Sequence, residues 1–221
     1  MLDRYQVQAE LVDSKIFTTP ILVVGAGGIG SFVVLTLAKM GFGDISVWDD
    51  DTIEEHNIAS QFYPEIAVGA GKVASLDVVV KAFTGVQIKG YPFNWDNEVA
   101  PYGMGGVVVS AVDNMATRTE LFRASIKAKS VGFVDGRMGG QQAEVYTVRI
   151  GERKEQAFYR SKLFPDAQAS PLRCTQKAVM YNVLWIASRM ANSVRLLLEG
   201  KPYNVGVIYD FENELQYNLV P

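Results

Sequence analysis

Residues 21–30 read ILVVGAGGIG, and this stretch decides the fold. Its four leading apolar residues predict a strand that is buried on both faces, and residues 26–43 predict a helix that ends in glycine. At their junction lie Gly25, Gly27, Gly28 and Gly30, whose missing side chains let backbone amides approach phosphate oxygens at the positive end of the helix. A strand, a glycine turn and a helix in direct succession therefore predict a nucleotide-binding turn.

Outward from this turn, the chain alternates strands and helices. A strand is predicted over residues 44–49, and because a parallel pair of strands needs a crossover, strand, helix and strand form one right-handed βαβ unit. The later predicted elements are a helix over 69–83, strands over 85–91 and 105–114, a helix over 114–129, strands over 131–136 and 142–150, and a closing hairpin over 204–220. The alternating pattern of residues 142–150 is typical of an antiparallel strand.

The predicted fold is α/β, a doubly wound, mainly parallel Rossmann-like sheet with antiparallel strands added in the C-terminal half. No shift in composition marks a boundary, so we expect one domain over residues 1–221. Its expected parts are a leader helix (1–19), a nucleotide-binding core (20–150), a crossing loop (151–173), and a long helix with the closing strands (174–221). A ligand should bind at the switch point of the sheet.

The composition argues against several classes of function. With 221 residues, 48% of them hydrophobic, the chain can bury one sizeable core. A net charge of −3 gives no broad field that would attract nucleic acid or anionic lipid, and no apolar run approaches the ~20 residues that span a bilayer. We therefore expect a cytoplasmic protein with no nucleic-acid or membrane partner. The single cysteine, Cys174, excludes an internal disulfide and a four-thiolate zinc site.

An acidic residue follows the glycine turn at the distance that nucleotide-binding folds use. Asp49 lies 19 residues after Gly30 and ends the second predicted strand, where a carboxylate accepts hydrogen bonds from ribose hydroxyls. Together with the glycine turn alone, Asp49 favours a nicotinamide or flavin enzyme, and the alternative hypothesis is a nicotinamide-dependent oxidoreductase.

The polar residues that follow change this hypothesis. They are Asp51, Asn57, Gln61 and Lys72 after the second strand, and Asp113, Asn114 and Arg118 after the fourth. In this order they resemble the adenylation domain of the ThiF/MoeB/ubiquitin-activating superfamily, whose pattern is a glycine turn, Asp-x-Asp, Asn then Gln, Gly-x-x-Lys, and Asp-Asn-x-x-x-Arg. The resemblance covers about residues 20–150 and resumes weakly at the predicted helix of Cys174.

This resemblance implies an enzyme that uses ATP and Mg²⁺. The C-terminal glycine carboxylate of a small ubiquitin-like or sulfur-carrier protein would attack the α-phosphate of ATP, and pyrophosphate would leave. Relatives usually pair two such domains, so we also expect a homodimer. Two other hypotheses stay open, namely the oxidoreductase, which leaves the later polar residues unexplained, and a binding module that has kept the fold and lost the chemistry.

The resemblance also implies roles for individual residues. Asp49 would hold the ribose, Lys72 would neutralise phosphate charge as a catalytic cation, and Asn57 would donate a hydrogen bond. Asp113 would hold Mg²⁺ and be catalytic, since Mg²⁺ prefers a carboxylate together with phosphate oxygens. The other nucleotide-binding positions would be Gly25, Gly27, Gly28, Gly30, Asp51, Gln61, Asn114 and Arg118.

Several of these residues also have a plainer interpretation. Lys72 is compatible with a solvated lysine at a helix start, and Asp51 with a simple turn residue. Asp113 and Asn114 are compatible with a cap of the next helix. Arg118, one turn into that helix, fits either a nucleotide contact or a solvated side chain.

The chain departs from the pattern of the superfamily at one important position. Relatives usually have an arginine where this chain has Ser60, so one cation expected near the triphosphate is missing. Arg137, at the end of a strand on the same sheet edge, is the candidate substitute, with a structural arginine as the alternative. Arg4 resembles the N-terminal arginine that reaches the ATP site of a neighbouring subunit. The missing cation motivates the binding-module hypothesis.

Cys174 lies after the crossing loop, at the predicted start of a helix over residues 174–198. The positive end of that helix, with Arg173 and Lys177 nearby, would lower the pKa of the thiol and favour the thiolate. The resemblance implies a nucleophile that accepts the activated carboxyl group, and the alternative is a buried structural cysteine. His56 has no partners for a metal site or a triad, so we expect a solvated loop residue.

Overall fold

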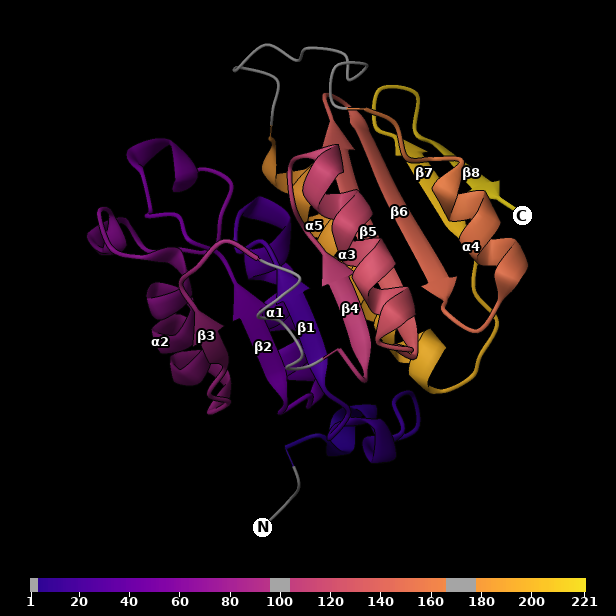
Figure 1. Cartoon of the computed structure of the whole chain (residues 1–221). Helices are drawn as coiled ribbons and strands as arrows, with labels where there is room; N and C mark the ends of the chain where they lie inside the picture. The colour runs from indigo at the N-terminus through magenta and orange to yellow at the C-terminus, as the bar shows by residue number, and fades with distance from the viewer. Residues whose placement is uncertain (1–3, 96–103, 166–177) are drawn as a thin grey trace.

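The computed structural model describes residues 4–95, 104–165 and 178–221, which form an α/β fold around one eight-stranded sheet (Figure 1). The strand order is β3-β2-β1-β4-β5-β6-β7-β8, in which the first five are parallel and the last three are added antiparallel. The strands are β1 (Ile21–Val24), β2 (Ile45–Trp48), β3 (Lys89–Tyr91), β4 (Val107–Ser110), β5 (Gly132–Gly139), β6 (Gln142–Arg149), β7 (Gly206–Asp210) and β8 (Leu215–Leu219). The predicted fold class is confirmed.

Strand β1 is central to the parallel part of the sheet. All four of its residues are buried, as an apolar run covered on both faces requires. Val24 pairs with Trp48 of β2 on one side and with Ser110 of β4 on the other. Because the chain order reverses between β1 and β4, the carboxyl ends of these strands form the switch point at which such sheets bind ligands.

Helices cover both faces of the sheet (Figure 1). One face carries α1 (Gly28–Met40), α2 (Lys72–Thr84) and α5 (Met180–Leu198), and the other carries α3 (Met115–Lys127) and α4 (Arg153–Arg160). Each face has its own hydrophobic core, built on the first face around Leu37, Leu76 and Ile186, and on the second around Leu121, Phe122 and Tyr159. No helix in the described part of the chain has the length and apolarity that crossing a membrane requires.

The predicted leader helix is wrong. Residues 4–19 form two short 3-10 helices, Gln6–Gln8 and Ser14–Ile16, instead of one amphipathic α-helix. The side chain of Asp13 accepts a hydrogen bond from the Lys15 amide and starts the second helix there, which interrupts the first. Val7 is 94% exposed, so the apolar spacing does not correspond to a packed face.

The predicted crossing loop contains a helix, α4, that sequence periodicity does not reveal. Its residues are mostly charged or polar, and Tyr159 is the one buried residue in it. Helix α5 begins at Met180 instead of residue 174, since Val179 has extended backbone angles. Cys174 lies outside the described residues, so its position at the start of a helix stays a prediction.

We predict that Gly30→Ala lowers the free energy of unfolding by about 3 kcal/mol, because a Cβ at this position would lie 1.8 Å from the carbonyl oxygen of Gly25. Urea unfolding at pH 7 measures the change. The matched control is Gly43→Ala, where the added Cβ meets no atom within 4 Å and the change should stay within ~0.5 kcal/mol. Equal stability of the two variants would contradict the close approach of α1 to β1.

Candidate functional site

Two glycines of the turn are required by the packing of the protein itself. Gly25 has a φ of +95°, and a Cβ there would lie 2.5 Å from the carbonyl oxygen of Ala111. Gly30 faces Gly25 across the same turn, with no room for a side chain. These contacts hold the start of α1 against β1 and against the segment that follows β4.

The packing of the protein does not require a glycine at position 27. Gly27 precedes α1 with a φ of −74°, and a Cβ there would meet only the side-chain nitrogen of Gln61, at 3.9 Å. Among the described residues, the backbone amides of Gly27 and Gly28 have no hydrogen-bond acceptor. Open space and free amide donors at a helix N-terminus are what a phosphate group requires.

Asp49 holds the glycine turn in place. One carboxylate oxygen accepts a hydrogen bond from the Ala26 amide at 2.7 Å, and the other accepts one from the Asp51 amide at 2.9 Å. The side chain is almost fully buried. A carboxylate has about four lone-pair sites, so these two bonds leave acceptor capacity for the ribose hydroxyls that the sequence predicts. The ribose contact itself stays a prediction.

Lys72 is not a solvated lysine. It is the first residue of α2, its side chain is only 8% exposed, and its Nζ lies 2.6 Å from a carboxylate oxygen of Asp51. Asp49 lies 4.0 Å from the same nitrogen. Asp51 is therefore more than a turn residue, because it holds the ammonium group at the edge of the glycine turn. The positive charge of Lys72 faces two carboxylates.

The loop between β2 and α2 brings two further predicted residues to this edge. Asn57 is buried, and its side-chain oxygen accepts a hydrogen bond from the Glu54 amide at 2.9 Å. Gln61 lies beside Gly27, and within the described ranges its side-chain oxygen is buried without a hydrogen-bond partner. His56 is exposed and lies 3.3 Å from Glu54, so the expected solvated loop residue is confirmed.

Asp113 and Asn114 follow β4, next to the glycine turn. Asn114 caps α3, since its side chain accepts a hydrogen bond from the Thr117 amide at 2.8 Å, and the capping interpretation is correct for this residue. Asp113 is exposed and takes no part in the cap. Its carboxylate lies 3.4 Å from the side-chain nitrogen of Asn114, which is a long hydrogen bond. In the described ranges no lysine or arginine forms an ion pair with Asp113, so its carboxylate suits a hard cation such as Mg²⁺.

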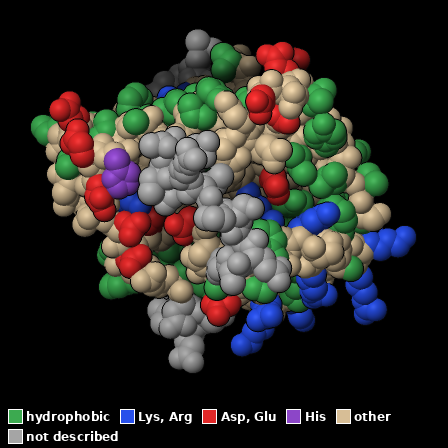
Figure 2. Space-filling model, turned by 90° about the horizontal axis from the view of Figure 1, so that it is seen from above, with side chains coloured by type: hydrophobic (Ala, Val, Ile, Leu, Met, Phe, Trp, Pro, Cys, Tyr) green, Lys and Arg blue, Asp and Glu red, His purple; other side chains and the backbone are tan. Residues whose placement is uncertain are grey.

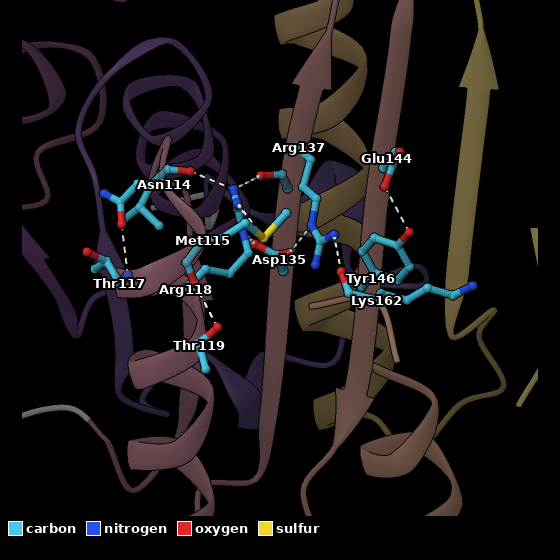
Figure 3. A network of polar contacts seen from close by, with 12 residues as sticks. Asn114, Met115, Thr117, Arg118, Thr119, Asp135, Arg137, Glu144, Tyr146 and Lys162 are labelled. Atoms are coloured by element: carbon cyan, nitrogen blue, oxygen red, sulfur yellow. Dashed lines mark hydrogen bonds and ion pairs between the residues drawn. The ribbon is translucent and has the colours of Figure 1, made fainter. Parts of the chain in front are cut away.

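Arg118 is not solvated, and its guanidinium points toward Asp135 of β5 (Figure 3). Its guanidinium is buried, with Nε 2.6 Å from a carboxylate oxygen of Asp135 in β5 and Nη2 2.6 Å from the carbonyl oxygen of Val112. Arg118 therefore ties the segment that ends in Asp113 to the neighbouring strand. The predicted nucleotide contact has no support in this arrangement.

Arg137 belongs to the same buried network (Figure 3). Its Nε lies 2.7 Å from Asp135, its Nη1 donates to the carbonyl oxygen of Lys162 at 2.8 Å, and its guanidinium lies over the ring of Tyr146. These contacts support the structural interpretation of Arg137, and its Nη2 is buried without a hydrogen-bond partner among the described residues. Arg4 donates to the carbonyl oxygen of Thr84 in its own chain.

Asp135 is the residue of this network that the sequence did not reveal. Burial disfavours its charged form, but Arg118 and Arg137 outweigh this effect and hold the pKa of Asp135 below its ordinary value. The hydroxyl group of Tyr159 donates a further hydrogen bond to it at 2.9 Å. The sequence signal that could have indicated Asp135 is a charged residue within an otherwise apolar strand. A charge buried there needs partners of opposite charge.

The charge around the site is unevenly distributed. Figure 2 looks onto the edge at which β1, β2 and β4 end, and basic side chains gather at its lower right margin while several acidic ones lie on the left. The exposed acidic residues in the loop between β2 and α2 are Asp50, Asp51, Glu54, Glu55 and Glu65. A triphosphate at this edge would need positive charge from Lys72 and from bound Mg²⁺.

Known proteins resemble both the sequence and the fold. A sequence model of the ThiF family matches residues 5–216. The adenylyltransferase and sulfurtransferase MOCS3 of Anopheles gambiae is 36% identical over 125 residues, which are 53% of this chain and 27% of MOCS3. The molybdopterin-synthase adenylyltransferase of Salmonella typhimurium is 27% identical over 219 residues, 93% of this chain and 82% of that protein. The chain spans about a quarter of the length of MOCS3 and most of the Salmonella protein.

Solved structures resemble the fold as well. The E. coli protein MccB, crystallised with AMPCPP and MccA, superimposes with a TM-score of 0.80 and 18% identity over 99% of this chain and 71% of MccB. PaaA superimposes with a TM-score of 0.77 and 16% identity, over 98% of this chain and 68% of PaaA. At these identities the likeness concerns the fold alone.

We predict that Asp135→Asn lowers the free energy of unfolding by about 3–5 kcal/mol at pH 7, because it leaves two buried guanidinium groups without a counter-charge. Folding lowers the pKa of Asp135, so its contribution is present above the unfolded pKa of about 4 and is lost as the pH falls through the folded pKa. The difference between wild type and variant in urea unfolding should therefore shrink at low pH.

The matched control for this prediction is Asp44→Asn. Asp44 forms a partly exposed ion pair with Lys89 at 2.7 Å, which is expected to contribute less than about 1 kcal/mol. If Asp135→Asn cost as little as this control, the buried network would not be the stabilising feature that its geometry indicates.

Proposed function

The chain belongs to the ThiF family, and from this premise we propose that it adenylates the C-terminal glycine carboxylate of a small ubiquitin-like or sulfur-carrier protein. The observation that carries the proposal is the space around Gly27, where the amides of Gly27 and Gly28 have no acceptor among the described residues, between the ends of the strands that precede Asp49 and Asp113. A nicotinamide enzyme would share the glycine turn and Asp49. It would have no use for the free carboxylate of Asp113 or for the buried Lys72.

The geometry suits the chemistry of adenylation. The carboxylate of the carrier attacks the α-phosphate of ATP, the bond to the β-phosphate breaks, and pyrophosphate leaves. The amides of Gly27 and Gly28 are placed to donate to phosphate oxygens, and Lys72 adds a fixed positive charge at the same edge. Asp113 would hold Mg²⁺, which when bound neutralises charge on the phosphates.

The shortage of cations gives a second candidate function some weight. Ser60 stands where the superfamily pattern usually has an arginine, Lys72 is already paired with Asp51, and Arg137 is held by Asp135. These pairings favour a module that binds a carrier protein without activating it, unless Mg²⁺ or a second subunit supplies the charge. Formation of the adenylate is therefore the measurement that separates the two candidates.

We further propose that the protein acts as a homodimer in the cytoplasm. Support for a subunit contact comes from the exposed part of α5, where Tyr181 and Leu184 are each 45% exposed. Arg189 on the same helix is half-buried, its Nε has no hydrogen-bond partner within the described residues, and burial lowers its pKa. Exposed apolar side chains and a half-buried arginine whose Nε has no partner among the described residues suit a contact that supplies a carboxylate.

We predict that Asp113→Ala reduces ATP–pyrophosphate exchange by at least about 100-fold, because the phosphates lose the carboxylate that would hold Mg²⁺. Exchange is measured with labelled pyrophosphate, Mg²⁺, and a β-grasp carrier protein that ends in Gly-Gly. The control Asp44→Ala removes a carboxylate at the opposite end of β2 and should leave exchange within about twofold of wild type. Undiminished exchange in Asp113→Ala would exclude the assigned role, and no exchange in wild type would favour the binding module.

A separate prediction concerns Cys174, which we propose as the nucleophile that accepts the activated carboxyl group from the adenylate. Cys174→Ser should leave ATP–pyrophosphate exchange within about twofold of wild type, since adenylation precedes the transfer step. It should abolish the thiol-sensitive adduct between the chain and the carrier, which intact-protein mass spectrometry detects. An adduct of wild-type amount in the serine variant would rule out this thiol as the acceptor.

A further inference from the structure

We propose that Tyr63 is a positioning residue for ATP, because its hydroxyl group sets the direction of the Gly27 amide. The inference rests on the proposed function, since it concerns how the same site orients its nucleotide. Tyr63 lies in the loop between β2 and α2 and belongs to none of the motifs that carry the resemblance to the superfamily.

The hydroxyl of Tyr63 donates a hydrogen bond of 2.6 Å to the carbonyl oxygen of Ala26. This oxygen belongs to the same peptide group as the amide of Gly27. No described peptide bond is cis, and in a trans peptide the C=O and N–H bonds point in opposite directions. The Gly27 amide therefore points away from the Tyr63 hydroxyl, and it has no hydrogen-bond acceptor among the described residues.

The preceding peptide group is held as well. The amide of Ala26 donates to Asp49 at 2.7 Å, so Ala26 is fixed through its N–H on one side and its C=O on the other. The neighbouring residue strengthens the same link, because the Phe62 amide donates to the hydroxyl of Ser31 at 3.0 Å. The loop that carries Gln61 is thus joined to the glycine turn at two adjacent residues.

Burial makes this tyrosine a constant donor. Tyr63 is 6% exposed, and its pKa is raised far above the ordinary value, first by burial and then by the carboxylates of Asp49 and Asp51. The hydroxyl stays protonated over the whole range in which the protein is studied. A phenylalanine would fill the same space and lose only the hydrogen bond.

The test uses the full chain and the non-hydrolysable analogue AMPCPP with Mg²⁺. Tyr63→Phe should raise the Kd of AMPCPP, measured by calorimetry, by about fivefold, since one buried hydrogen bond that orients a donor is lost. In the exchange assay the KM for ATP should rise to a similar extent, while kcat stays within about twofold. A general loss of stability would not produce this split.

The matched control is Tyr203→Phe. The hydroxyl of Tyr203 donates to Glu155 at 2.7 Å, and the ring of Tyr203 lies next to the guanidinium of Arg149. Arg149 pairs with Gly132, the first residue of β5, so Tyr203 lies at the opposite end of the sheet from the site. This variant should lose stability to a comparable extent and keep the wild-type Kd. If both variants weakened binding equally, or if Tyr63→Phe bound as wild type does, the inference would be overturned.

A second variant covers the case in which Tyr63→Phe does not fold. Ser31→Ala removes the other link between the loop and the turn, and it should raise the Kd in the same direction by about twofold. A wild-type Kd in Ser31→Ala would then overturn the inference. Failure of wild type to bind AMPCPP would instead defeat the proposed function, so the two failures are distinguishable.

Discussion

The close approach of α1 to β1 and to the end of β4 is the constraint on which the rest of the structure depends. Gly25 and Gly30 leave no room for a Cβ, and the helix N-terminus is thereby brought to the carboxyl ends of the parallel strands. Neighbouring strands then deliver Asp49 and Asp113 to the same edge without further adjustment. The site is a consequence of how tightly one helix packs on the sheet.

Carboxylates shape this site more than cations do. Asp49 holds two backbone amides, Asp51 holds Lys72, and Asp135 holds the arginine that fixes the segment before Asp113. Carboxylates that are already paired within the protein repel a triphosphate less strongly than unpaired carboxylates would. Negative residues thus fix the geometry of the site. In its described part, few lysine or arginine side chains are without an ion-pair partner.

Sequence reasoning predicted the features that have a pattern. The apolar run of β1, the glycine turn and the Asn114 cap each follow from a local rule, and the family resemblance placed Lys72 and Asp113 at the same edge. Elements without a periodic pattern of apolar residues were not predicted. Helix α4 is one of them, because its residues are mostly polar. Asp135 and Tyr63 act through partners distant in sequence, and no local rule connects a loop tyrosine with a carbonyl 37 residues earlier.

The bond from Arg118 to the carbonyl of Val112 makes the position of Asp113 depend on a charge pair buried one strand away. Asp135 cannot be lost alone, because the buried guanidinium groups of Arg118 and Arg137 would then both lack a counter-charge. A change at Asp135 is therefore expected to accompany changes at both arginines, and the three positions should covary among relatives of this chain.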